Sequence, residues 1–117
     1  MKHTDIFAQR GVALTNKRWS WGGFDRDGKV HLNMWADRFE GGQYVFPPNR
    51  GTKNSRNELI TLIKHALEHN DGRFGAVMSR AEDVRAMPRK VASSRSVPDM
   101  RVIEFDEHTG AFKAIWA

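Results

Sequence analysis

The apolar and polar positions along the chain predict several short strands and one long helix. In residues 55–69 the apolar side chains recur at helical spacing and form a single stripe, so this segment is expected to be an amphipathic helix. Residues 29–35 alternate instead with a period of two. Aliphatic side chains occupy one face of this predicted strand, and His31, Asn33 and Trp35 occupy the other.

A hairpin is predicted around residues 25–28. Residues 18–24 form its first strand, and the turn ends in a glycine, which tolerates a positive φ. Residues 87–99 contain two prolines and three serines without any helix or strand period, so this segment is expected to be a loop. The remaining pattern predicts short strands at residues 12–16, 44–46, 74–79, 101–105 and 111–116, and short helices at residues 4–10 and 81–86.

Together these elements predict an α+β fold in one domain that spans residues 1–117. About six strands, connected mainly as hairpins, are expected to form a mixed or antiparallel sheet that curls into a small β-barrel, with one long helix and one short helix. Strands and helices do not alternate along the chain, and the sequence has no glycine-rich phosphate loop. Both observations argue against a doubly wound nucleotide-binding fold.

Charge and composition narrow the classes of function. The 117 residues carry a net charge of +5, and between residues 42 and 101 eleven Lys and Arg residues stand against six Asp and Glu residues. This basic surplus favours a polyanionic partner such as DNA or RNA. Cysteine is absent, which excludes disulfide scaffolds, thiolate zinc sites and cysteine nucleophiles and makes a cytoplasmic location the simplest expectation. No apolar run is long enough for a secretory signal or for a membrane span, so no membrane partner is expected.

Aromatic residues gather around the predicted hairpin and form a candidate binding site. Burial in the core is one explanation of such a cluster, because aromatic side chains favour strands and pack well. However, an indole beside an imidazole and an amide favours a pocket that stacks a flat heterocycle and hydrogen-bonds to its edge, with the indole of Trp35 partly exposed. The predicted base-binding residues are Trp19, Trp21, His31, Asn33, Trp35 and Tyr44.

Basic residues in the segments around this cluster are candidates for phosphate contacts. Solvated charge is the usual role of Lys and Arg, but basic loops and aromatic rings occur here together, which favours binding to a nucleic-acid backbone. The H-x-x-E-H pattern at residues 65–69 matches a zinc-protease helix, yet its side chains are expected to face water, so no metal site, catalytic residue or cofactor is predicted. The predicted phosphate-binding residues are Arg50, Lys53, Arg56, Arg80, Arg89, Lys90 and Arg95.

Several stretches resemble a known family. Residues 16–22 and 30–35, followed by the long helix, residues 75–83, residues 86–90 and a closing hairpin, are similar to small PUA-like domains of the EVE/ASCH type, found in bacterial modification-dependent restriction systems. The resemblance implies a barrel-like sheet with an aromatic pocket that receives a flipped, often modified base. By that analogy Trp21 and Trp35 stack the base, while the backbone is held by Arg80, Arg89 and Lys90. The chain has no nuclease motif, so a nuclease or other effector would be a separate chain.

The first function expected is therefore a non-catalytic nucleic-acid-binding module, with DNA favoured over RNA as the partner. Two alternatives stay open. One is a small nucleoside amidohydrolase of the ASCH type, for which Thr15, Lys17 and Glu104 are the only candidate set. The other is a basic protein-interaction module from a mobile element.

Overall fold

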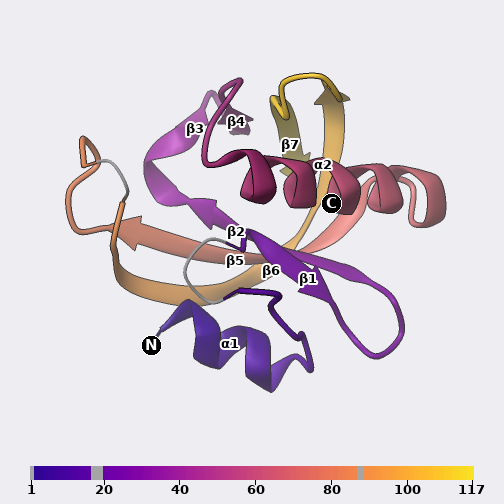
Figure 1. Cartoon of the computed structure of the whole chain (residues 1–117), viewed down its shortest axis with the longest axis horizontal. Coiled ribbons are helices and arrows are strands. Elements are labelled where there is room, and N and C mark those ends of the chain that lie inside the picture. The colour runs from indigo at the N-terminus through magenta and orange to yellow at the C-terminus, as the bar shows by residue number, and fades with distance from the viewer. Residues whose placement is uncertain (1, 17–19, 87–88) are drawn as a thin grey trace.

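The computed structural model describes residues 2–16, 20–86 and 89–117. Within these ranges the chain forms two α-helices, one 3-10 turn and seven strands, which confirms an α+β fold with one long and one short helix (Figure 1). In chain order the elements are α1 (His3–Gln9), β1 (Gly22–Phe24), β2 (Val30–Trp35), η1 (Ala36–Arg38), β3 (Phe39–Glu40), β4 (Gln43–Phe46), α2 (Lys53–His69), β5 (Arg73–Ala81), β6 (Val91–Phe105) and β7 (Phe112–Trp116).

The strands form one mixed sheet in the order β1-β2-β5-β6-β7-β4-β3. β2 and β5 are parallel, and every other pair of neighbouring strands is antiparallel. The predicted closure into a barrel is wrong, because β1 and β3 remain the open edges of the sheet in the described ranges. These edge strands have only three and two residues, too few backbone groups for a ladder that would join them.

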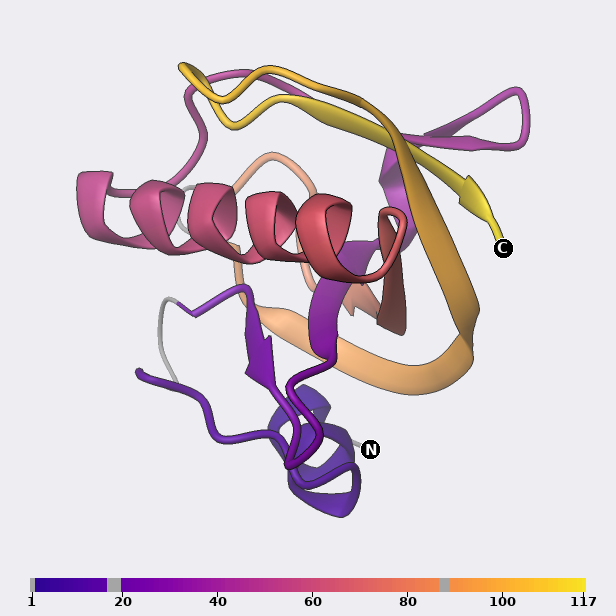
Figure 2. The same cartoon turned by 90° about the vertical axis from the view of Figure 1, so that its right-hand side faces the viewer.

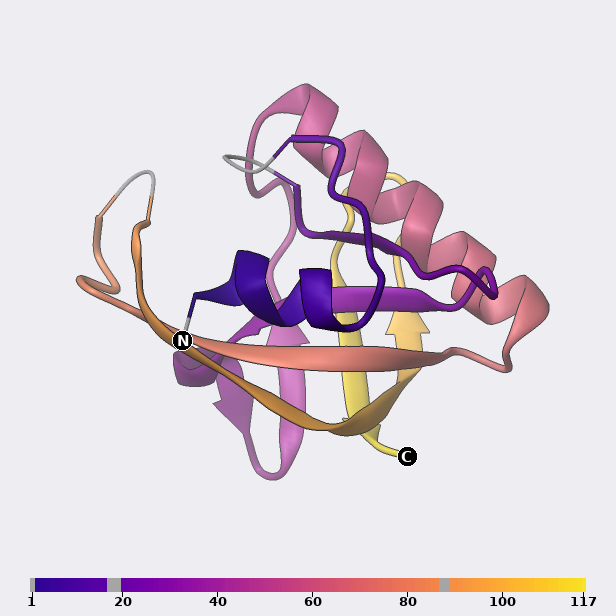
Figure 3. The same cartoon turned by 90° about the horizontal axis from the view of Figure 1, so that it is seen from below.

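The sheet is strongly curved and carries a helix on each face. α2 lies on the concave side, and α1 packs on the outside across β5 and β6 (Figure 2, Figure 3). The main core fills the space between α2 and the concave face, where the aliphatic face of β2 meets the apolar stripe of the helix. A second, smaller cluster joins α1 to the outer face of β5 through Ile6, Phe7, Val12 and Val77.

α2 confirms the long helix that its apolar stripe predicts. It begins at Lys53, two residues earlier than expected, because the Thr52 hydroxyl oxygen caps it by accepting a hydrogen bond from the Ser55 N–H at 3.2 Å. This cap ties the loop of residues 49–52 to the helix. Neither helix of the described chain combines the length and the apolar character that a membrane crossing requires.

The β1–β2 hairpin is confirmed, but its first strand is shorter than predicted. Only Gly22–Phe24 pairs with β2, and residues 12–16 form no strand. Gly22 is required here, because a Cβ would lie 1.8 Å from the carbonyl oxygen of His31. Just before β1, the carbonyl oxygen of Trp21 accepts a hydrogen bond from the Asn33 N–H at 2.7 Å, which fixes Trp21 beside β2.

β6 is the largest departure from the sequence prediction. Much of residues 87–99, expected to be a loop, belongs to this 15-residue strand. Phe74 and Ala76 on β5 are two positions apart, but their partners on β6, Met100 and Val97, are three positions apart. β6 therefore carries one extra residue beside Pro98. A bulge tolerates proline, since a residue there need not donate to the ladder. The proline therefore marks an irregularity within a strand rather than its end.

Two predictions for neighbouring segments have opposite outcomes. The short helix at residues 81–86 is wrong: β5 extends to Ala81, and the Asp83 carboxylate then accepts a hydrogen bond from the Arg85 N–H at 2.9 Å. Such local side-chain bonds to the backbone compete with helix formation.

The closing hairpin is confirmed, with Phe105 of β6 opposite Phe112 of β7.

Candidate functional site

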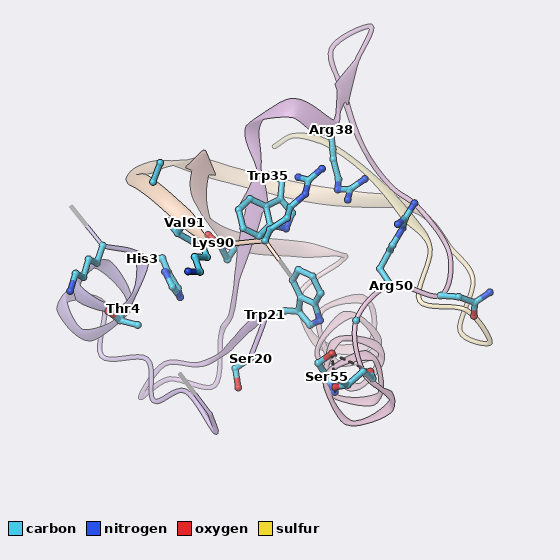
Figure 4. Close-up of a pocket in the computed structure, with 17 residues that line it drawn as sticks. His3, Thr4, Ser20, Trp21, Trp35, Arg38, Arg50, Ser55, Lys90 and Val91 are labelled. Carbon is cyan, nitrogen blue, oxygen red and sulfur yellow. Dashed lines mark hydrogen bonds between the residues drawn. The ribbon is translucent and has the colours of Figure 1, made fainter. Parts of the chain in front are cut away.

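One concave site, called the pocket below, lies where several distant parts of the chain meet. It has a volume of about 900 Å³, near the upper end of the roughly 300–1,000 Å³ usual for ligand sites. Its wall combines residues 2–4 with residues 20–21, the second half of β2, the start of α2 with the loop before it, and residues 89–92 at the start of β6 (Figure 4). Edges of both helices and of the sheet therefore line one cavity.

Trp21 lies in the wall of the pocket, as predicted. Its indole is half-buried and packs edge-on against Phe46, with the ring centroids 5.1 Å apart. The Nε1–H of the indole is buried and has no acceptor among the described residues. Trp21 thus offers ring surface to the pocket. Phe46 packs against the ring, and the hydrogen bond from the Asn33 N–H fixes the Trp21 backbone.

Trp35 also lines the pocket, but it is not the partly exposed ring that the alternation predicts. Its indole is only 7% exposed. The guanidinium of Arg89 lies over the indole, 5.3 Å from the ring centroid. This guanidinium donates two hydrogen bonds, of 2.7 and 2.9 Å, to the Asp37 carboxylate. The backbone N–H of Trp35 donates to the Tyr44 hydroxyl oxygen at 3.1 Å. Trp35 is therefore core and pocket wall at once.

Asn33 is the polar side chain that β2 contributes to the wall, again as predicted. The hydroxyl of the buried Ser79, on the neighbouring strand β5, donates to the Asn33 Oδ1. The Ser79 hydroxyl also lies 2.7 Å from that of Ser94 on β6. A short chain of hydrogen bonds across three strands thereby fixes the Asn33 amide.

The wall of the pocket is positively charged. Arg50 and Lys90, both predicted to bind phosphate, are exposed there, and neither forms an ion pair within the described ranges. Arg89 lines the pocket with its charge balanced by its carboxylate partner. Sequence reasoning missed Arg38, whose burial lowers its pKa and whose guanidinium lies 5.7 Å from the ring centroid of Phe46. Arg38 lies three residues after the end of β2, and nothing in the sequence distinguishes it from the other arginines. No acidic residue of the described chain lines the pocket.

Other predicted site residues lie elsewhere. Tyr44 is almost completely buried in the core, and burial raises its pKa. His31 is buried outside the pocket, and Trp19 lies outside the described residues, so its role stays a prediction. The predicted phosphate-binding residues that do not line the pocket are Lys53, Arg56, Arg80 and Arg95.

His31 belongs to a separate polar cluster close to the end of α1. Its Nε2 lies 2.9 Å from the Asp25 carboxylate, and the Arg10 guanidinium lies 3.3 Å from its Nδ1. Because a guanidinium can only donate, Nδ1 accepts and Nε2–H donates to Asp25. This hydrogen bond lowers the pKa of Asp25. On the next strand a Cβ at Gly75 would lie 2.2 Å from Nδ1, so packing of the imidazole requires glycine there.

Asp25→Asn is expected to destabilise the fold at neutral pH more than in acid. The pKa of Asp25 is lower in the folded chain than in the unfolded chain. Its carboxylate therefore stabilises the fold above the unfolded pKa of about 4, and this contribution is lost as pH falls through the lowered value. Urea denaturation at pH 7 and at about pH 3 measures the difference. Asp27→Asn, in the exposed part of the same turn, is the control; equal losses for Asp25→Asn at both pH values would contradict the assignment.

The candidate hydrolase residues are not brought to the pocket. Thr15 is exposed, and Glu104 pairs with Lys113 on the surface at 3.2 Å. Lys17 lies outside the described residues. Residues 2–16, 20–86 and 89–117 contain no group of three His, Asp or Glu side chains placed to hold a metal ion. His65 of the H-x-x-E-H pattern packs edge-on against Phe24 at 4.8 Å instead.

Comparisons with protein-family models, with curated proteins and with solved structures find no match for this chain. The resemblance to PUA-like domains therefore stays a prediction from the sequence. The evidence for function is the pocket itself, which combines indole rings, an amide and a surplus of positive charge.

Proposed function

We propose that this chain binds nucleic acid without catalysis, taking one base into the pocket and holding the backbone phosphates with cations at its rim. The composition of the wall carries the proposal: two indoles, one fixed amide and several cations, with no carboxylate from the described residues. A ligand that is both flat and anionic matches this wall, because aromatic rings stack bases and Lys and Arg bind phosphates.

Trp21 is the proposed stacking surface. Its indole is half-buried, and no cation from the described ranges covers it, whereas the ring of Trp35 lies under the Arg89 guanidinium. A base that enters on this side meets Arg89 first, and a guanidinium plane is itself a stacking surface for bases. Trp35 then supports the base indirectly, by positioning Arg89 together with Asp37.

The resemblance to PUA-like modules adds the finer part of the proposal: the base is flipped out of its strand and carries a modification. The size of the pocket supports this part, because about 900 Å³ is enough for a drug-sized ligand and exceeds a single unmodified base. Extraction of a base from a duplex costs stacking and pairing energy, so single strands should bind more tightly than duplexes.

The proposal predicts a steep salt dependence that originates at the rim of the pocket. Arg50→Ala together with Lys90→Ala is expected to weaken binding to a single-stranded oligonucleotide. The slope of log affinity against log salt should become shallower by about 1.4, because each phosphate contact on a single strand contributes about 0.7. Fluorescence anisotropy at several salt concentrations measures the slope.

Arg80→Ala together with Arg95→Ala is the matched control. Both arginines are exposed and neither lines the pocket, so this pair removes the same charge from elsewhere on the surface. The control should leave most of the slope intact. An equal loss of slope in both double variants would show that the phosphates do not bind at the pocket. Absence of binding at low salt would refute the proposed function.

A further inference from the structure

The Asn33 amide faces the pocket with one end already occupied. Its Oδ1 accepts the hydrogen bond from the Ser79 hydroxyl, on the side of β5. Ser79 is fully buried and is held in turn by the hydroxyl of Ser94, so this orientation is fixed by the interior of the sheet. Asn33 itself is half-buried, and its Nδ2 has no hydrogen-bond acceptor among the described residues. Because Oδ1 already accepts from the interior of the sheet, the part of the amide that has no partner in the described chain is Nδ2, which is a donor.

The rest of the wall also offers more donors than acceptors. Cations such as Arg50 and Lys90 can only donate. The hydroxyls of Ser20 and Ser55 have partners in the protein: the Ser20 hydroxyl donates to Glu58 at 3.1 Å, and the Ser55 hydroxyl donates to the carbonyl oxygen of Thr52 at 3.1 Å. The Thr4 hydroxyl and the Asn49 amide, which form no side-chain hydrogen bond within the described ranges, can still accept from a ligand. No acidic residue from the described ranges supplies a free acceptor. A ligand therefore meets a wall that is richer in N–H donors than in free acceptors.

We propose that the pocket prefers keto bases, namely 6-oxopurines and 4-oxopyrimidines, over their amino counterparts, and that Asn33 determines this preference. The inference rests on the proposed function. A carbonyl oxygen on the base edge accepts from the Asn33 Nδ2. An exocyclic amino group in the same place would set donor against donor and leave both unsatisfied in a partly desolvated site. One such hydrogen bond corresponds to about a tenfold preference in affinity.

The test uses short single-stranded oligonucleotides that differ in one central base. Hypoxanthine is compared with adenine, and uracil with cytosine, because the main change in each pair is the keto or amino group. Fluorescence anisotropy at low salt gives the ratio of affinities within each pair. The keto oligonucleotide is expected to bind about tenfold more tightly in both pairs.

Asn33→Asp is the decisive variant. It keeps an oxygen for the Ser79 hydroxyl and replaces the amide nitrogen with a second acceptor of the same shape, so the preference should disappear or reverse. Asn49→Asp is the matched control, since it adds the same charge to the wall of the pocket and should keep the ratio. Ser79→Ala removes the hydroxyl that orients the amide and should bring the ratio towards one.

The outcomes separate this inference from the function on which it rests. If the wild-type protein binds no oligonucleotide at low salt, both are wrong. If it binds but favours neither member of each pair, or if Asn33→Asp leaves the ratio unchanged in a folded protein, the base preference is wrong and nucleic-acid binding stands.

Discussion

Trp35→Ala is expected to reduce the free energy of unfolding by about 3–5 kcal/mol, the usual cost of removing a large aromatic side chain from a core. The indole is 7% exposed and packs within the main core. Its loss would also leave Arg89 without the ring beneath its guanidinium. Urea denaturation of the variant measures the change.

Trp116→Ala is the control for this prediction. Its indole, at the end of β7, is 45% exposed, and among the described residues the one aromatic ring that it stacks on is Phe39, so its removal should cost about 1 kcal/mol or less. A Trp35→Ala variant as stable as the wild type, but with weakened nucleic-acid binding, would contradict the structural role and restore Trp35 as an exposed stacking surface.

Trp21→Ala is expected to weaken binding to a single-stranded oligonucleotide by tenfold or more. Stacking of a base on an aromatic ring contributes about 1–3 kcal/mol, and about 1.4 kcal/mol corresponds to a factor of ten in affinity. The ring also packs on Phe46, so the variant will lose some stability. Binding must therefore be measured at a temperature where circular dichroism shows the variant to be folded.

Trp116→Ala serves again as the control, because this exposed indole does not line the pocket. It should bind as tightly as the wild-type protein. Full affinity in the folded Trp21→Ala variant would show that the base does not stack on Trp21, and equal losses in both variants would show that the aromatic contribution is unspecific.

The elements that the sequence predicts well are those whose signal is local. The stripe of α2 and the alternation of β2 are complete within one segment, so the helix and the hairpin are confirmed. The part of β6 before residue 100 is not predicted because its signal is not local: Pro98 is tolerated through a register shift against β5. The open sheet likewise depends on how short β1 and β3 are, which their composition does not determine.

For the pocket, too, the local features are predicted and the features that depend on distant segments are not. Placing His31, Asn33 and Trp35 on one face of β2 is correct as a statement about alternation. What covers each side chain depends on distant segments: Arg10 contacts His31, while Arg89 reaches Trp35 from the start of β6. Arg89 and its partner Asp37 are 52 residues apart in the sequence. The alternation in the sequence therefore predicts which side chains share one face of β2. Which of those side chains line the pocket depends on contacts with distant segments.

The most direct test of nucleic-acid binding at the pocket is a nuclear magnetic resonance titration of the isotope-labelled protein with a short single-stranded oligonucleotide at low salt. If the pocket binds the oligonucleotide, the largest chemical-shift changes will involve Trp21, the Asn33 side-chain amide and the backbone around Arg50 and Lys90. Resonances of the separate His31 cluster should change little. No change at low salt, or changes centred on Arg80 and Arg95 away from the pocket, would contradict binding at the pocket.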